Sequence, residues 1–294
     1  MGSVTNSFND VAGAFVEAEN PGFLGTNRVW QLENDEQRTF LNYLEILMPY
    51  VPQLKKDGLL KAMVTWNAAE LNAWFAQNGS NITFEQGPDG EFYVGSIYEQ
   101  MVKWKIPGVV KPLRGANGVL YPDGVHMEEG IRFYTSPHVA NPVVRIETKT
   151  EGDMAYMVML DAPPSGPFGP MKLAHDISQD LVPTWGHNEL LFPMVHIDHS
   201  VDMRWLVGLW TLNDAGKRAV VRAAKQHTIL KINELGALAK SSFGMTVFTE
   251  SVRVANLYTI DRPFLFFIIR NGYILPMFTA WVDYSEWKNP VSIG

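Results

Sequence analysis

The sequence predicts an α+β fold with helices in its first third and strands in most of the remainder. Apolar residues recur at helical spacing in residues 35–54 and 59–77. Two strongly apolar strand segments, residues 227–232 and 264–269, bracket a stretch of small and polar residues. Short apolar runs bounded by turn residues fill most of the chain from residue 92 onwards.

Composition limits the function classes. The chain has 294 residues, 46% hydrophobic and 19% charged, as expected for a globular protein. A net charge of -7 and the lack of a Lys/Arg run argue against a nucleic-acid partner. The absence of cysteine excludes disulfides and thiolate metal sites. No signal pattern and no membrane-length apolar run are seen, so we expect no membrane partner and favour an intracellular over a secreted protein, with the localisation open.

The elements follow in order. Helices are expected at residues 9–19, 35–54, 59–77, 173–181, 202–212 and 214–225. Residues 92–104 read as one long strand, and residues 125–127 and 130–134 as a strand pair. Residues 143–146 and 154–160 form the next hairpin, and residues 273–282 pair with residues 264–269 around Asn271-Gly272.

The connector between the two apolar strands has an unusual composition. No proline interrupts it between Gly236 and Arg262, and its residues alternate as in a strand. Small side chains at Ala237, Ala239 and Ser241 share one side. Because loops normally carry turn residues, this segment is expected to be a loop that can become a strand.

Two motifs resemble the serpin family. The run Tyr258-Thr-Ile-Asp-Arg-Pro-Phe-Leu-Phe-Phe-Ile268 matches that family's C-terminal signature, and Glu234-Leu-Gly236 resembles its Glu-x-Gly hinge at the required upstream spacing. Weaker similarity at Leu71-Asn72-Ala-Trp74 and at Ser96-Ile97-Tyr98 with Lys103-Trp104 follows in the family's order.

This resemblance implies a single serpin-like domain over residues 1–294. Its architecture would be a large mixed central sheet, smaller sheets that include residues 264–282, and surrounding helices. Residues 71–294 would form the recognisable core, residues 1–70 a reduced and divergent helical region, and residues 236–260 the reactive-centre-like loop.

The resemblance also implies the site residues. Glu234, Gly236, Ala237, Ala239 and Ser241 would form the hinge of a loop that inserts into the main sheet after cleavage. Counting from either end leaves the cleavage position open, so the reactive-site candidates are Glu250, Ser251, Val252, Arg253 and Val254. Trp104 would lie where the loop enters the sheet. Ser96 and Gln226 occupy the positions of the family's polar residues beneath the sheet, and His227 is displaced by one residue from the second of these positions.

No enzyme signature accompanies these motifs. The sequence contains no hydrolase elbow, phosphate loop, dinucleotide fingerprint or HExxH motif, so we expect no catalysis and no cofactor. The best metal candidates are His187, His196, Asp198 and His199, but His199 points away from the His196 face of a strand. A hydrogen-bonded polar set is the preferred interpretation, and no metal is expected.

Two functions remain open. The first is a serine-protease inhibitor acting as a suicide substrate, with a trypsin-like partner if Arg253 is the cleavage residue. The second is a non-inhibitory serpin derivative that serves as a structural or binding subunit of an assembly or self-associates. A chaperone or storage role cannot be separated from the second by sequence.

Overall fold

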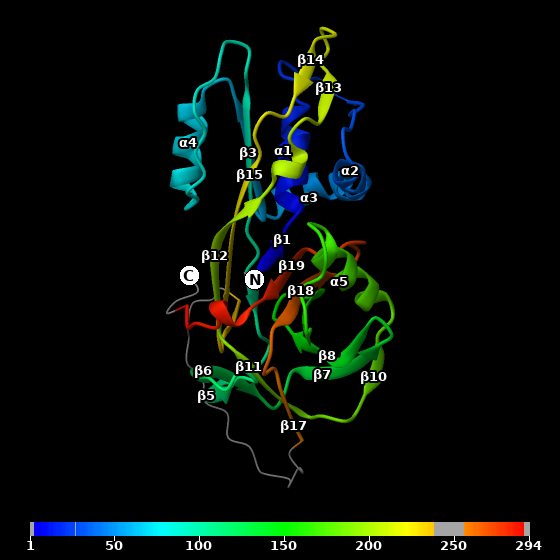
Figure 1. Cartoon of the computed structure of the whole chain (residues 1–294), viewed down its shortest axis with the longest axis vertical. Helices are drawn as coiled ribbons and strands as arrows, with labels where there is room; N and C mark the ends of the chain where they lie inside the picture. Colours follow the sequence, from blue (N-terminus) through cyan, green and yellow to red (C-terminus); the bar gives the residue numbers. More distant parts are fainter. Residues whose placement is uncertain (1–2, 27, 238–255, 291–294) are drawn as a thin grey trace. The chain divides into compact units, whose positions relative to one another are not determined.

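The computed structural model describes residues 3–26, 28–237 and 256–290 (Figure 1). The chain divides into two compact units, which are described separately below. The first comprises residues 1–6, 101–198 and 229–294, and the second comprises residues 7–100 and 199–228. Within the described residues, no helix combines the length and apolarity that crossing a membrane requires.

A seven-stranded sheet forms the centre of the first unit. Its strand order is β1-β19-β18-β9-β8-β7-β10, and every neighbouring pair is antiparallel. The strands are β1 (Val4–Asn6), β7 (Ile131–Ser136), β8 (Val139–Glu147), β9 (Asp153–Met159), β10 (Val182–Thr184), β18 (Phe264–Arg270) and β19 (Phe278–Val282).

The continuous apolar run of β18 lies in the middle of this sheet. Its first five residues are buried, which explains why the strand does not alternate apolar and polar side chains. Helix α5 (Gly169–Gln179) packs against β18 and β19 (Figure 1). Ala174 and Ile177 of this helix share a buried cluster with Leu265 and Phe267. Burial on both faces therefore fixes β18 as the core strand.

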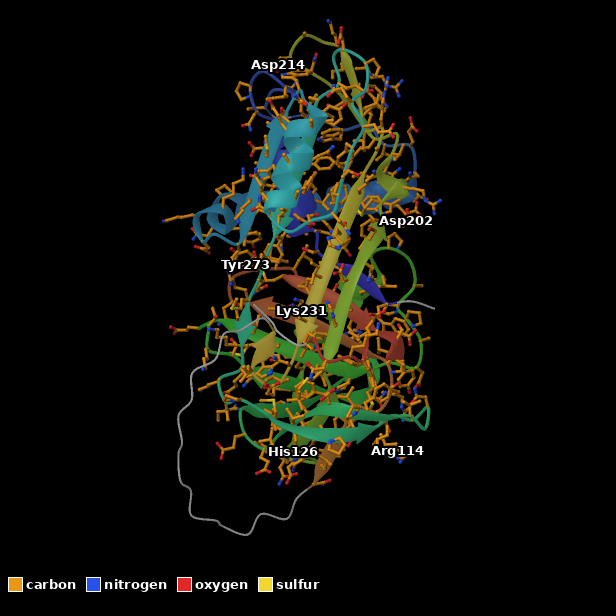
Figure 2. All side chains as sticks on the ribbon, turned by 90° about the vertical axis from the view of Figure 1, so that its left-hand side faces the viewer. Arg114, His126, Asp202, Asp214, Lys231 and Tyr273 are labelled. Atoms are coloured by element: carbon orange, nitrogen blue, oxygen red, sulfur yellow. The ribbon has the colours of Figure 1, made fainter. Side chains whose placement is uncertain are left out.

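The first unit also contains a four-stranded sheet of order β17-β11-β6-β5. Its strands are β5 (Val109–Arg114), β6 (Leu120–Met127), β11 (Glu189–Pro193) and β17 (Leu257–Thr259). The β11–β17 pair is parallel and the other two pairs are antiparallel. Arg114 and His126 lie on this sheet (Figure 2).

The second unit packs helices against a two-stranded sheet of β2 (Leu60–Thr65) and β3 (Tyr93–Tyr98). Its helices are α1 (Asn9–Ala18), α2 (Asp35–Leu47), α3 (Val51–Lys56) and α4 (Ala68–Gln77). Leu71 and Phe75 of α4 form a buried cluster with Tyr93 of β3. Strands β12 (Val195–Asp202) and β15 (Lys225–Ile232) connect segments assigned to the two units.

Several sequence-based predictions of secondary structure are confirmed. Helix α1 lies within the predicted residues 9–19. The helix predicted over residues 35–54 is present as α2, a short 3-10 helix η1 (Met48–Tyr50) and α3, which ends at Lys56. The β8–β9 and β18–β19 pairs agree with the predicted hairpins, although β19 begins only at Phe278.

The prediction of one helix over residues 59–77 is wrong for its first half. Leu60–Thr65 is strand β2, paired antiparallel with β3 from Leu60↔Tyr98 to Thr65↔Tyr93. Six cross-strand pairs override the helical spacing of its apolar residues. The helix starts only after Asn67, whose side chain accepts a hydrogen bond from the backbone N–H of Ala69 and caps it.

The two helices predicted over residues 202–212 and 214–225 are absent. This region instead contains a 3-10 turn η2 (Arg204–Leu206) and the hairpin β13 (Trp210–Leu212) with β14 (Arg218–Val220). Asn213 starts the hairpin turn, because its side-chain oxygen accepts from the backbone N–H groups of Ala215 and Lys217.

Three predictions about sheets also need correction. Strands β6 and β7 do not pair with each other, because they belong to different sheets. The long strand predicted over residues 92–104 is divided into β3 and β4 (Val102–Lys103). Residues 264–282, which were predicted to belong to a smaller sheet, lie in the seven-stranded sheet. All pairs in that sheet are antiparallel, and parallel pairing occurs between β11 and β17.

Candidate functional site

The predicted hinge begins with a tight turn after β15. The backbone N–H of Asn233 donates to the carbonyl of Gly236 at 2.9 Å, and the Asn233 side-chain oxygen accepts from the N–H of Leu235 at 2.9 Å. The chain then enters strand β16 (Gly236–Ala237), which pairs antiparallel with β4 in the register Gly236↔Lys103 and Ala237↔Val102. The connector therefore starts as a strand.

Glycine is required at position 236. Its φ angle is +144°, and a Cβ atom placed there would lie 2.3 Å from the backbone oxygen of Val102. A larger residue would strain the backbone and push β16 away from β4. The glycine of the Glu-x-Gly motif thus permits close pairing between the start of the connector and β4.

Trp104, predicted to lie at the loop entry, contacts this turn. Its buried indole Nε1 donates to the backbone oxygen of Asn233 at 3.0 Å, and its backbone N–H donates to the oxygen of Leu235 at 3.1 Å. The oxygen of Glu234 accepts from the N–H of Gly108 at 2.8 Å. Glu234, Gly236 and Trp104 are consequently brought together in one unit.

The exit end of the connector is held by two asparagines. The backbone N–H of Asn256 donates to the side-chain oxygen of Asn188 at 2.9 Å, and the N–H of Asn188 donates to the backbone oxygen of Asn256 at 3.1 Å. The Asn256 amide also donates to the oxygen of Gly186. These bonds start the parallel pairing of β17 with β11. Sequence analysis missed both asparagines, because their partnership joins segments far apart in the chain.

A polar cluster in the second unit contains two more predicted residues. Gln226 of β15 is buried, and its Nε2 donates to the backbone oxygen of Ser7 at 2.6 Å and to the two carboxylate oxygens of Asp10 at 3.0 and 3.2 Å. The hydroxyl of Ser96 donates to the backbone oxygen of Asp10. His227, the neighbour of Gln226 along β15, is half-buried.

Asp10 is the member of this cluster that sequence analysis missed. Burial of its carboxyl group raises the pKa of Asp10 to about 6, against the opposing effect of hydrogen bonds from Gln226 and nearby groups. An acidic residue in the first turn of the helix predicted over residues 9–19 was the available signal, but nothing in the sequence aligned it with Gln226.

Three solved structures resemble this chain in fold. The chain is similar to mouse protein-Z dependent protease inhibitor, with 11% identity, 96% of this chain and 91% of that chain covered, and a TM-score of 0.59. Serpin48 of the insect Tenebrio molitor gives 13% identity, 96% and 92% coverage and a TM-score of 0.59. Human thyroxine-binding globulin gives 12% identity, with 95% of this chain and 91% of that chain covered, and a TM-score of 0.56. The chain has the serpin fold. No family model matches it, and no curated sequence matches it.

Within this serpin fold, several predicted site residues fall outside the described segments. They are the hinge residues Ala239 and Ser241 and the reactive-site candidates Glu250, Ser251, Val252, Arg253 and Val254. Their roles stay predictions. The described structure supplies the two ends between which they lie, at Ala237 and Asn256.

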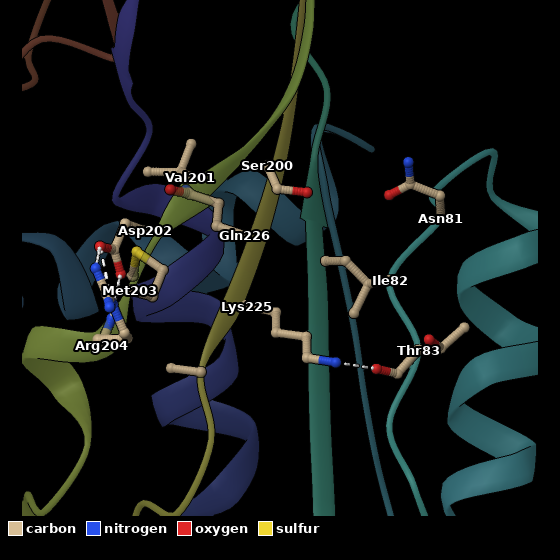
Figure 3. A pocket seen from close by; sticks show the side chains of 11 residues that line it. Asn81, Ile82, Thr83, Ser200, Val201, Asp202, Met203, Arg204, Lys225 and Gln226 are labelled. Carbon is tan, nitrogen blue, oxygen red and sulfur yellow. Dashed lines mark hydrogen bonds and ion pairs between the residues drawn. The ribbon is translucent and has the colours of Figure 1, made fainter.

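An open pocket of about 350 Å³ lies in the second unit (Figure 3). Its basic residues already have partners: Lys225 Nζ donates to the Thr83 backbone oxygen at 2.6 Å, and Arg204 forms an ion pair with Asp202. Hydrogen bonds from Arg204 lower the pKa of Asp202 to about 2. Both basic side chains of the pocket are therefore already engaged in contacts within the second unit.

The metal candidates from sequence analysis do not form a cluster. Within the described segments, the set of side chains close enough to hold an ion is His126, Glu128 and Glu189, all in the first unit. No sequence pattern connects His126 of β6 with Glu189 of β11, because the β6–β11 register is a tertiary property.

Proposed function

We propose that this chain is a serine-protease inhibitor of the serpin type, acting as a suicide substrate through the connector between β16 and β17. The observation that carries the proposal is the pairing of Gly236–Ala237 with β4. A segment that already begins as a strand against β4 has a template on which further residues can add after cleavage.

The proposed chemistry uses the protease's own serine. That serine attacks the carbonyl of the scissile peptide, the amine side of the bond leaves, and the carbonyl stays attached to the protease as an ester. The freed segment then extends strand β16 beyond Ala237 in the two-stranded sheet that β16 forms with β4, and it carries the protease with it. Small residues at Ala239 and Ser241 suit passage into a packed sheet.

Arg253 is the preferred cleavage residue, with the bond on its C-terminal side. It is the basic residue among the candidates 250–254, and a trypsin-like specificity pocket carries a carboxylate that pairs with arginine. Similarity to a protease inhibitor and to an insect serpin supports a protease partner. The alternative positions for the cleaved bond are at Glu250, Ser251, Val252 and Val254.

A protease panel tests the proposal. Incubation with trypsin-like proteases should give a complex that survives boiling in SDS, and mass spectrometry of the released peptide should place the cut after Arg253. Arg253→Ala should abolish this complex, whereas Arg38→Ala, which changes an exposed arginine of α2, should leave it intact. A complex that forms equally well with Arg253→Ala would disprove the assignment of Arg253.

The alternative is a non-inhibitory binding or structural subunit. Its support is the number of hydrogen bonds that hold the turn at residues 233–236. Trp104 and Gly108 donate to backbone oxygens of this turn, and the N–H of Leu235 donates to the side-chain oxygen of Asn233 within it. Thyroxine-binding globulin, a neighbour in fold, is a binding protein by name. Cleavage without a stable complex, and without a rise in thermal stability afterwards, would favour this alternative.

A further inference from the structure

His126 lies between two carboxylates in the four-stranded sheet. Its side chain is 5% exposed, its Nε2 is 2.9 Å from an oxygen of Glu189, and its Nδ1 is 3.6 Å from an oxygen of Glu128. Figure 2 shows His126 on this sheet. One potential ligand atom from each of His126, Glu128 and Glu189 lies within 4.8 Å of the other two.

The strand register explains why these groups converge. The β6–β11 pairs include Met127↔Leu190 and His126↔Leu191. Glu128 follows the last residue of β6, in a bend, and Glu189 is the first residue of β11, so both glutamates adjoin the Met127–Leu190 pair. Both carboxylates approach the His126 ring from there, and like charges held close together are destabilising unless a positive charge compensates them.

Among the ion pairs of the described segments, Glu128 and Glu189 interact with His126 and with no Lys or Arg. A metal cation bound to one imidazole nitrogen and to both carboxylates would offset the repulsion between the two carboxylates.

We propose that His126, Glu128 and Glu189 form a binding site for a divalent transition-metal ion, with Zn²⁺ as the representative ion. One imidazole nitrogen and one oxygen from each carboxylate are suitable zinc ligands. Tetrahedral zinc places its ligand atoms about 3.4 Å apart, since each bond is about 2.1 Å long. Glu128 is 66% exposed and has room to move inward, and water completes the coordination.

The proposal does not depend on protease inhibition. A bound ion would join β6 to β11 and stabilise the sheet that also carries β17, whether or not the connector is an inhibitory loop. Its test therefore measures metal binding directly and needs no protease.

The experiment uses the full chain after removal of metal with EDTA. Isothermal titration with Zn²⁺ should show one saturable site with a micromolar dissociation constant, and Co²⁺ should give the visible absorption bands of a four-coordinate ion. The unfolding temperature should rise by several degrees when Zn²⁺ is in large excess over the dissociation constant. Absence of saturable binding up to millimolar Zn²⁺ would refute the site.

Two variants and one control test the ligands. His126→Asn and Glu189→Gln should each weaken Zn²⁺ binding at least tenfold and remove the Co²⁺ bands. Glu189→Gln preserves shape and relieves the repulsion, so it keeps the test valid if His126→Asn folds poorly. His138→Asn is the matched control, because His138 pairs with one carboxylate, Asp180, at 2.8 Å. Unchanged binding in Glu189→Gln, or equal loss in His138→Asn, would refute the proposal.

Discussion

The indole Nε1 of Trp104 donates a hydrogen bond to the backbone oxygen of Asn233 at 3.0 Å. This bond joins the residue that follows β4 to the turn that follows β15, so it fixes the turn from which the connector starts. The same tryptophan also binds Leu235 through its backbone N–H. Four predictions concern this turn, the polar cluster at Asp10 and the core strand β18.

Replacing Trp104 with phenylalanine should destabilise the protein by about 2 kcal/mol, because the backbone oxygen of Asn233 loses its shorter hydrogen bond and the smaller ring leaves a gap. Urea unfolding measures the loss. The matched control is Trp185→Phe at a side chain that is 93% exposed, which should change stability by less than about 0.5 kcal/mol. Similar losses in the two variants would contradict a structural role for the Trp104 hydrogen bond.

Gly236→Ala should separate β16 from β4. Its Cβ would approach the Val102 oxygen to 2.3 Å in addition to the strain of a φ of +144°. Gly216→Ala is the control, since Gly216 also has a positive φ, +70°, but nothing lies within 4 Å of the added atom. We expect about 1 kcal/mol of destabilisation in the control and clearly more at Gly236, measured by thermal unfolding. Equal effects would show that the close approach to Val102 is unimportant.

Asp10 should make stability depend on pH. Its pKa is about 6 in the folded protein against an ordinary value of 3.8, so the folded protein binds more protons than the unfolded chain between these values. Stability should therefore fall as pH rises from about 4 to about 6, by at most about 3 kcal/mol.

Asp10→Asn removes this titration and retains an oxygen that accepts from Gln226. The variant should be more stable than the unchanged chain at pH 7 and should lose the decline between pH 4 and 6. Urea unfolding at several pH values measures both effects, with Asp89→Asn at an exposed residue of the same unit as the control. A variant that is less stable at pH 7 would refute the assignment.

Asp153→Asn should weaken the anchoring of β18 to β9. The Asp153 carboxylate is 1% exposed and accepts from Arg270 Nε at 2.6 Å and from a terminal nitrogen of Arg270 at 2.8 Å. Loss of its charge removes the buried partner of two hydrogen bonds from Arg270, and we expect a cost of about 3 kcal/mol in urea unfolding. Asp202→Asn breaks an exposed pair with Arg204 and should leave the unfolding midpoint unchanged. Equal midpoints in both variants would contradict the prediction.

Local sequence patterns predicted those elements whose tertiary contacts favour the same secondary structure. The apolar run at the start of β18 and the Asn271-Gly272 turn between β18 and β19 each indicate their structure through their own residues. Residues 60–65 and 202–225 were misassigned for the opposite reason. Their apolar residues also fit helical spacing, and pairing with β3 or a hairpin turn at Asn213 decided against it.

The candidate sites divide in the same way. Glu234, Gly236 and Trp104 were predicted from motifs, and the structure brings these residues together at the hinge turn. Asp10, Asn188 and Asn256 were missed, because each acts through a partner that lies far away in the sequence. Glu189 is the same case, since its approach to His126 exists only in the β6–β11 register.

By itself, the sequence determined the α+β class and the order of the motifs that resemble serpins, since these depend on local spacing. It also determined that the chain can adopt a positive φ at position 236, since glycine has the backbone freedom to do so. Only the tertiary structure decided which strands share a sheet and which distant polar groups meet. The physical reason is that strand pairing and buried hydrogen bonds are long-range: their free energy depends on a partner's position, which no local pattern encodes.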